Sequence, residues 1–316
     1  MTDKRQTTPS TDAAVKSGAE AAAEGFPALL LEAETVAHTV AAGAHGRRKA
    51  GPGESFWQHR PYAFGDPVSA IDWRQSARAS DRLYVRQNEW AASASAWFWR
   101  DPSQSLDFRS DKALPTKRRR ADVLTLALAI LLAKAGERIG LIGGRSDPYH
   151  GRLAPELLLQ ALHTDDYDNA ARLQPRRIRE GAAVIVVSDF YDDPDALEAA
   201  AASYAAQGAK GVLLQIIDPA EAVFPYAGRT EFEDLESPAR LLFGDAGAVR
   251  DRYLEAFAAL ETNLKTTARR LGWAFIRHRT DATASDGLFA LTSVLNDQTF
   301  QAAPGTATPA AQKRGA

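Results

Sequence analysis

From residue 94 onward, short apolar segments alternate with longer amphipathic ones, and this alternation constrains the fold more than any other feature of the 316-residue chain. Each short segment has the length and composition of a buried strand, and each longer one has the apolar spacing of a helix. The order predicts an α/β domain in which helices cover both faces of a mostly parallel sheet. The expected strands are Ser95–Arg100, Arg138–Ile142, Ala183–Val187, Val212–Ile217 and Trp273–His278. The expected helices are Arg118–Ala135, Ala154–His163, Pro194–Gln207 and Ala246–Leu271.

The rest of the chain divides into parts of different composition. Residues 1–25 and 298–316 are rich in small, polar and charged residues without an apolar period, and they are expected to be disordered tails. Residues 26–93 hold an amphipathic helix, expected at Pro27–Ala42, and a segment rich in Trp and Arg. Residues 94–297 form the α/β domain, which includes a possible hairpin of Thr230–Phe232 with Ala239–Phe243.

Composition narrows the class of protein. Hydrophobic residues make up 45% of the chain and charged residues 25%, as in ordinary proteins with a sizeable core. The net charge of −2 indicates no general attraction to nucleic acid or to an anionic membrane. The chain has no cysteine, which excludes disulfides, thiol catalysis and cysteine-type zinc sites. No apolar run reaches the length of a membrane helix and no signal-peptide core is present, so the cytoplasm is the expected location.

The motif Asp101-Pro102-Ser103-Gln104-Ser105 follows the first expected strand. If the segment is extended, the carboxylate of Asp101 and the hydroxyls of Ser103 and Ser105 lie on one side of it. Such an all-oxygen set suits Mg²⁺ or Mn²⁺. Asp189 follows another strand, and loops at the carboxyl ends of parallel strands meet at one edge of the sheet. We therefore predict a metal site of Asp101, Ser103, Ser105 and Asp189. The alternative is an ordinary turn, in which Asp and Ser cap backbone donors.

The residues that an enzyme would need are less evident. No Walker phosphate loop and no Gly-x-Ser-x-Gly elbow occur in the sequence. Histidines such as His45, His59 and His163 are scattered, and a structural or exposed role is the commoner one for each. The run Arg118–Arg120 could bind phosphate, although the solvated first turn of a helix is the commoner role. No pattern in the sequence identifies a general base near the expected metal, so no catalytic residue is assigned.

The segment at 54–86 combines aromatic bulk with Arg and Asp. Aromatic residues at this density are expected to pack onto the sheet domain, with Trp57 and Trp73 largely buried. Arg60, Arg74 and Asp72 are then expected in polar networks at the edges of the aromatic rings. The alternative is a surface that binds a partner.

The strings at residues 51–66 and 71–78 strongly resemble the family called domain of unknown function 58, and the resemblance runs from about residue 30 to 297. It implies a von Willebrand factor A-like, Rossmann-like fold with a metal-ion-dependent adhesion site, and a partnership with MoxR-type AAA+ ATPases. Asp101, Ser103, Ser105 and Asp189 match the adhesion-site positions. The threonine that such sites take from a middle loop has no match: Gly143–Leu153 offers only Ser146 and Asp147, and Thr164 falls beyond the next helix.

These observations favour a non-enzymatic interaction or adaptor protein that binds Mg²⁺ or Mn²⁺ and works with a MoxR-type ATPase in complex assembly or chaperone-like maturation. The alternative is a metal-dependent hydrolase or phosphoryl-transfer enzyme that uses the same Asp/Ser cluster. A base within reach of a metal-bound water distinguishes the two, because only the enzyme needs one.

Overall fold

The computed structural model describes residues 11–44, 56–61, 73–78, 83–88, 95–144, 147–164, 172–192, 194–233, 235 and 239–300. Within these residues, five parallel strands form the central sheet in the order β4-β3-β5-β6-β9. Each was predicted to within two residues at either end. The strands are β3 (Ser95–Arg100), β4 (Arg138–Leu141), β5 (Ala183–Ser188), β6 (Lys210–Ile217) and β9 (Ala274–Arg279). The prediction of an α/β domain with a mostly parallel sheet is confirmed.

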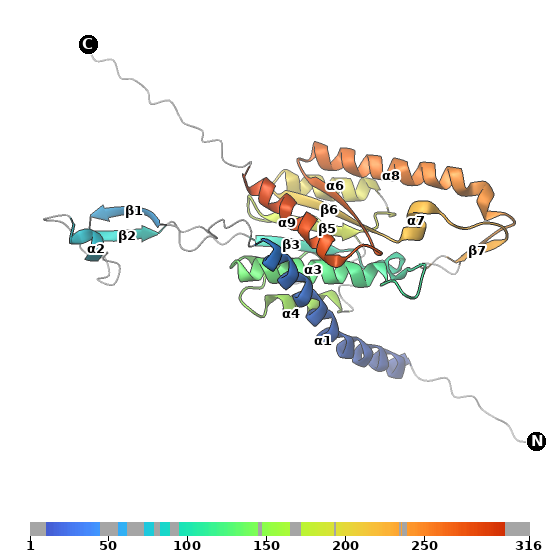
Figure 1. Cartoon of the computed structure of the whole chain (residues 1–316), viewed down its shortest axis with the longest axis horizontal. Coiled ribbons are helices and arrows are strands. Elements are labelled where there is room, and N and C mark those ends of the chain that lie inside the picture. Colours follow the sequence, from blue (N-terminus) through green and yellow to red (C-terminus); the bar gives the residue numbers. More distant parts are fainter. Residues whose placement is uncertain are drawn as a thin grey trace, which may run out of the picture.

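Helices cover both faces of this sheet (Figure 1). Side chains of α1, α3, α4 and α9 form one hydrophobic core with one face, and those of α6 and α8 form a second core with the other. The helices are α1 (Thr11–Ala44), α3 (Lys117–Lys134), α4 (Ala154–Leu162), α6 (Pro194–Ala205), α8 (Arg250–Arg270) and α9 (Ala284–Phe300). The short elements are η2 (Gln104–Asp107), α7 (Pro219–Val223), η3 (Ala246–Val249) and the antiparallel hairpin of β7 (Thr230–Glu233) and β8 (Arg240–Phe243), which was predicted.

The strand sequences account for the two cores. In β3, Ala96 and Phe98 face the core that contains α3, while Trp97 and Trp99 face the core that contains α6 and α8. Every residue of β3 is buried. A strand buried on both faces carries a continuous apolar run rather than an alternating one, as this strand does.

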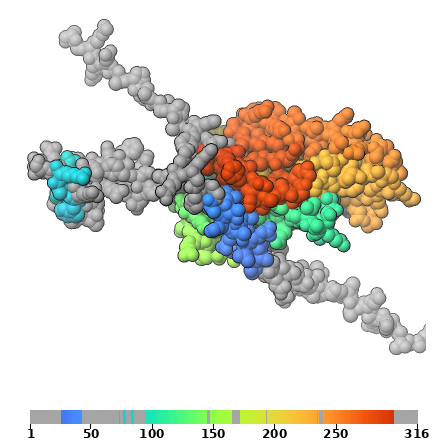
Figure 2. Space-filling model, in the orientation of Figure 1, coloured from blue at the N-terminus to red at the C-terminus, as the bar shows by residue number. Residues whose placement is uncertain are grey.

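Helix α1 begins at Thr11, not at Pro27, so the predicted start of this helix is wrong. Alanine has the highest helix propensity, and the alanine-rich residues 13–23 extend the helix ahead of Pro27. The buried residues Leu29, Ala33, Ala37 and Val40 recur at helical spacing, and α1 packs on α3 and α9. Figure 2 shows α1 (blue) against α9 (red) on the surface.

Helix α9 was not predicted, and it extends beyond the expected domain boundary at residue 297. Ala284, Leu288 and Leu291 lie on one face of it and are buried against the core. No helix in the described parts of the chain has both the length and the apolar content needed to cross a bilayer.

The Trp- and Arg-rich segment contains β1 (Phe56–Pro61) and β2 (Tyr84–Asn88), which pair antiparallel, and the one-turn helix α2 (Trp73–Ser76). Trp73 is 60% exposed, so the prediction that it is buried is wrong. A single turn of helix orders few neighbouring residues, and its buried side chain is Ser76, whose hydroxyl accepts a hydrogen bond from the backbone N–H of Tyr84. The predictions for Trp57, Arg60, Arg74 and Asp72 concern side chains outside the described ones.

Replacing Gly211 with Ala is expected to destabilise the fold by about 1–3 kcal/mol. A Cβ at Gly211 would lie 1.8 Å from the indole of Trp273. Trp273 is buried and its indole N–H donates to the Ala209 carbonyl, so the ring has no room to retreat. Urea unfolding measures the loss. Gly244→Ala is the control, since nothing lies within 4 Å of its added Cβ. Equal urea midpoints for the two variants would contradict the expected steric overlap with Trp273.

His278 is expected to make the fold sensitive to acid. Burial, with the nearby charge of Arg120, lowers the pKa of His278 to about 4, although Asp286 and Asp281 act to raise it. The folded state therefore takes up the proton at lower pH than the unfolded state does. The contribution of neutral His278 to the free energy of unfolding is fully present above about pH 6.5. It decreases by roughly 3 kcal/mol as the pH falls towards 4. As the pH is lowered from 7 to 4, the free energy of unfolding should decrease more for the wild type than for His278→Gln. An equal decrease in both proteins would contradict this.

Candidate functional site at the carboxyl edge of the sheet

The two predicted acidic residues lie at the ends of neighbouring strands. Asp101 follows β3 and Asp189 follows β5, and these strands are paired in parallel. The chain leaves β3 towards β4 on one side and later enters β5 on the other, so the site lies at the switch point of the sheet. The backbone N–H of Asp101 donates to the Val187 carbonyl at 2.8 Å, which joins the start of the motif to the end of β5.

All four predicted site residues belong to one hydrogen-bonded cluster. The Asp101 carboxylate accepts from the backbone N–H of Ser103 at 2.8 Å and from the Ser188 hydroxyl at 2.5 Å. The hydroxyls of Ser103 and Ser105 are 2.8 Å apart. The Ser105 hydroxyl donates to Asp189 Oδ2 at 2.8 Å. The tertiary structure therefore brings the predicted residues together.

One detail of the prediction needs correction. The motif is not extended throughout, because residues Gln104–Asp107 form the 3₁₀ turn η2, in which Leu106 is fully buried. Asp101 is 1% exposed, and both of its carboxylate oxygens accept hydrogen bonds. Asp101 thus caps its own turn and also joins the cluster, so the turn and the site are not alternatives.

The buried side chain of Lys117 was missed by the sequence analysis. It lies at the start of α3, where its ammonium group donates to Asp189 Oδ2 at 2.8 Å and to Glu221 Oε1 at 2.6 Å. Lys117 is only 1% exposed. Its Nζ also lies 5.1 Å from the centre of the Tyr191 ring. A cation of the chain itself therefore neutralises the carboxylate that was expected to bind metal.

This ion pair changes the acidity of its members. Burial alone would lower the pKa of Lys117, but the charges of Asp189 and Glu221 outweigh it, so the pKa is raised. Burial raises the pKa of Glu221, although Lys117 acts to lower it. A lysine that holds its proton more tightly than usual is a stable counter-ion and a poor base at neutral pH.

Two arginines hold the motif in place. Arg100 is 1% exposed, its Nε lies 3.0 Å from Asp122 Oδ1, and its guanidinium donates to the carbonyls of Asp101 and Leu162. The distance between Arg100 Nε and Asp122 Oδ1 is that of an ion pair, but the two atoms are not aligned for a hydrogen bond. Arg118 donates to the carbonyls of Pro102 and Ser103 and pairs with Asp107.

All three arginines of the run Arg118–Arg120 have partners within the chain. Arg119 pairs with Glu32 of α1, and Arg120 donates to the Thr280 carbonyl. These side chains therefore link the first turn of α3 to other elements of the fold.

The candidates for the middle-loop ligand lie in different places. Asp147 lines a cavity with Ser95 and Arg138, which begin β3 and β4, so it lies at the opposite edge of the sheet. Thr164 lies just past the end of α4, where the Arg100 guanidinium reaches the Leu162 carbonyl, and this brings that end of α4 to the motif. The Thr164 hydroxyl donates to the Ala161 carbonyl. Ser146 lies outside the described residues.

The donor set fits a small, hard cation. It supplies two carboxylates and two hydroxyls, and Mg²⁺ keeps several waters and needs few protein ligands. Within the ranges that the structure covers, no three carboxylate, imidazole or thiol groups gather in a metal-binding arrangement. Because Lys117 and Ser105 both donate to Asp189 Oδ2, a cation would have to displace Lys117 or bind the remaining oxygens of the cluster.

Comparison with known proteins identifies the family. The family model described as "Protein of unknown function DUF58" matches residues 58–263. An uncharacterized protein of Mycobacterium bovis is 30% identical over 251 residues, which cover 73% of this chain and 76% of that protein. Uncharacterized proteins of two Mycobacterium tuberculosis strains match equally well.

Among solved structures, an aerotolerance-related membrane protein from Bacteroides fragilis and BatB from Bacteroides thetaiotaomicron are 13% identical, with TM-scores of 0.37 and 0.40. Each match covers 65% of this chain and 100% of the solved one, and likeness at this level carries no argument about function. The extent of the family match, together with the mycobacterial relatives, shows that the chain belongs to the DUF58 family.

Proposed function

We propose that the chain is a non-enzymatic interaction protein of von Willebrand factor A-like type, whose crevice between β3 and β5 binds Mg²⁺ or Mn²⁺. Asp101, Ser103, Ser105 and Asp189 would hold the ion, and a carboxylate of a partner protein would complete its coordination. The observation that carries the proposal is the single hydrogen-bonded cluster of these four residues at the switch point of the sheet, which Asp101 joins through the backbone N–H of Ser103.

The surroundings of the cluster favour binding over catalysis. Lys117 donates a hydrogen bond to Asp189, and its raised pKa makes it unsuited to remove a proton from water. We propose a MoxR-type AAA+ ATPase as the partner and complex assembly in the cytoplasm as the setting. The partner rests on the family resemblance, and the setting rests on the apolar pattern of the sequence.

One observation favours the alternative of a metal-dependent hydrolase or phosphoryl-transfer enzyme. His163 lines a cavity of about 450 Å³ together with Ser103, Gln104 and Arg118, so an imidazole lies near the cluster. Its Nε2, however, is 3.6 Å from Asp122 Oδ2 on the side of α3. Metal-stimulated hydrolysis of a generic phosphate ester that is lost in His163→Ala would favour the enzyme.

Titration calorimetry with Mg²⁺ and Mn²⁺ tests the metal site. Asp101→Asn and Ser103→Ala are expected to weaken binding at least about tenfold, because each change removes an oxygen ligand or its charge. Asp111→Asn is the control, since Asp111 is exposed and caps the backbone N–H of Ala113. Absence of heat with the wild type, or equal affinity in all variants, would refute the metal site.

The partner is tested separately. A purified MoxR-type ATPase from the same organism is expected to bind the wild type in the presence of Mg²⁺, and to bind less after chelation or with Asp101→Asn. Binding that is insensitive to both treatments would separate the partner from the metal, and no binding would reject this partner.

A further inference from the structure

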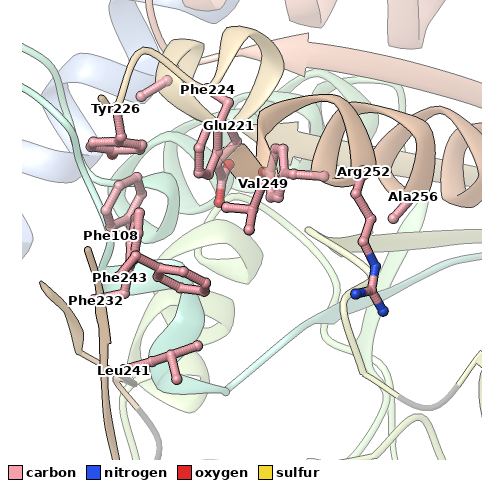
Figure 3. A pocket seen from close by; sticks show the side chains of 12 residues that line it. Phe108, Glu221, Phe224, Tyr226, Phe232, Leu241, Phe243, Val249, Arg252 and Ala256 are labelled. Carbon is pink, nitrogen blue, oxygen red and sulfur yellow. The ribbon is translucent and has the colours of Figure 1, made fainter. Parts of the chain in front are cut away.

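A second, apolar pocket lies beside the Asp/Ser cluster. It has a volume of about 520 Å³, within the range of pockets that bind ligands. Six of the twelve residues that line it are aromatic (Figure 3). They come from separate segments of the chain: Phe108 after η2, Phe224 and Tyr226 after α7, Phe232 in β7, Phe243 in β8 and Tyr253 in α8.

The pocket is held open by its own lining. The Phe224 ring lies 4.7 Å from that of Tyr253 and 5.9 Å from that of Phe232, and the Phe232 ring lies 5.8 Å from that of Phe243. Phe224 has φ 45°, a left-handed conformation that a bulky residue rarely adopts. Such strain persists only where the surrounding packing requires it, and it is often found at ligand clamps. The aromatic frame is therefore preformed.

The polar groups of the lining differ in whether they have partners. The Glu221 carboxylate accepts from Lys117 and from the backbone N–H of Asp218, so its charge is already satisfied. Arg252 lines the pocket from α8, on the far side of Val249 from the rings of Phe232 and Phe243 (Figure 3), and is exposed. In the described part of the chain, no carboxylate lies within ion-pair distance of Arg252. The mouth of the pocket therefore favours an anionic group next to an apolar one.

The surface around the mouth is also apolar. Leu241 lines the pocket and is 58% exposed, and the neighbouring Leu242, outside the pocket, is 54% exposed. A small molecule inside the cavity would leave Leu242 in water, whereas a polypeptide crossing the β7–β8 hairpin would cover it. Exposed apolar residues around a preformed pocket are typical of protein–protein contact sites.

We propose that this pocket binds a segment of a partner protein that places a bulky apolar side chain, best an aromatic one, in the pocket and an adjacent acidic residue against Arg252. The assignment goes beyond the metal site and does not depend on it. The two sites are nevertheless neighbours, since Lys117 donates to Asp189 in one and to Glu221 in the other. One partner segment could therefore contact both.

Two dyes and three blocked peptides test the pocket. The anionic dye 8-anilinonaphthalene-1-sulfonate and its neutral analogue N-phenyl-1-naphthylamine report binding by fluorescence. Ala256→Trp, which places a large side chain from the exposed Ala256 into the pocket, should abolish the binding of both. Arg252→Ala should weaken only the anionic dye, by about threefold, as expected for a partly exposed ion pair. Arg250→Ala, an exposed arginine of the same helix outside the lining, is the control.

The peptides identify the class of ligand. Acetyl-Phe-Asp-Leu-amide should displace the dye from the wild type, acetyl-Phe-Asn-Leu-amide should do so about threefold less well, and acetyl-Ala-Asp-Ala-amide should not displace it. The preference for Asp over Asn should disappear in Arg252→Ala. Binding of the dyes without displacement by the peptides would overturn the peptide assignment. Dye binding that Ala256→Trp leaves unchanged would overturn the pocket itself. Asp101→Asn should leave dye binding intact, so failure of the metal site would not affect this result.

Discussion

Replacing Lys117 with Met is expected to destabilise the protein by about 3–5 kcal/mol, the usual cost of removing one partner from a buried ion pair. Methionine keeps most of the volume of the lysine stem, so the loss would come from charge and not from a cavity. Asp189 and Glu221 would then remain buried without their shared counter-ion, and the side chain of Asp189 is 1% exposed. Urea unfolding measured by circular dichroism gives the difference.

Two further variants make this prediction specific. Lys265→Met removes a lysine that pairs with Glu261 on the exposed surface of α8, and it should cost no more than about 1 kcal/mol. Lys117→Met combined with Glu221→Gln should recover part of the loss, because one of the two unpaired carboxylates is then neutral. If Lys117→Met were no more destabilising than Lys265→Met, Lys117 would not be the counter-ion of the site.

Replacing Arg100 with Met is expected to cost a similar amount, about 3–5 kcal/mol. Arg100 connects the end of β3 to α3 through Asp122 and to the end of α4 through the Leu162 carbonyl. Among the described residues, its loss would leave Asp122, at 3% exposure, with His163 at 3.6 Å as the remaining ion-pair neighbour. Since Arg100 also donates to the Asp101 carbonyl, the motif should lose order together with stability.

The paired control is Arg240→Met on the β7–β8 hairpin, whose ion pair with Glu233 is about 60% exposed on both sides. It should change the free energy of unfolding by less than about 1 kcal/mol. Arg100→Met with Asp122→Leu should be more stable than Arg100→Met alone, because no buried charge remains unpaired. A double variant that is no more stable than the single one would show that the carboxylate of Asp122 was not the source of the loss.

The sequence by itself determined the order and type of the main elements. Strands such as Ala183–Ser188 are nearly continuous apolar runs, and the segments between the strands have apolar residues at helical spacing. Both patterns are local, so they predict the elements without knowledge of the tertiary structure. It also predicted that Asp101 and Asp189 would lie at the same edge of the sheet, because parallel strands carry their carboxyl ends to one edge. Where the local pattern was weak, the prediction failed. Trp73, on a single helical turn, was predicted to be buried but is exposed, and α1 begins ahead of the predicted start at Pro27.

Only the tertiary structure decided what surrounds those acidic residues. In the sequence, Lys117 is one of four consecutive basic residues, and nothing local distinguishes it from Arg118 to Arg120. It is buried because Asp189 and Glu221, from distant segments, converge on it; without them the burial of an ammonium group would be too costly. The aromatic pocket arises in the same way, from rings far apart in the chain. Contacts of this kind depend on how helices and strands pack against one another, so the periodicity of the sequence does not predict them.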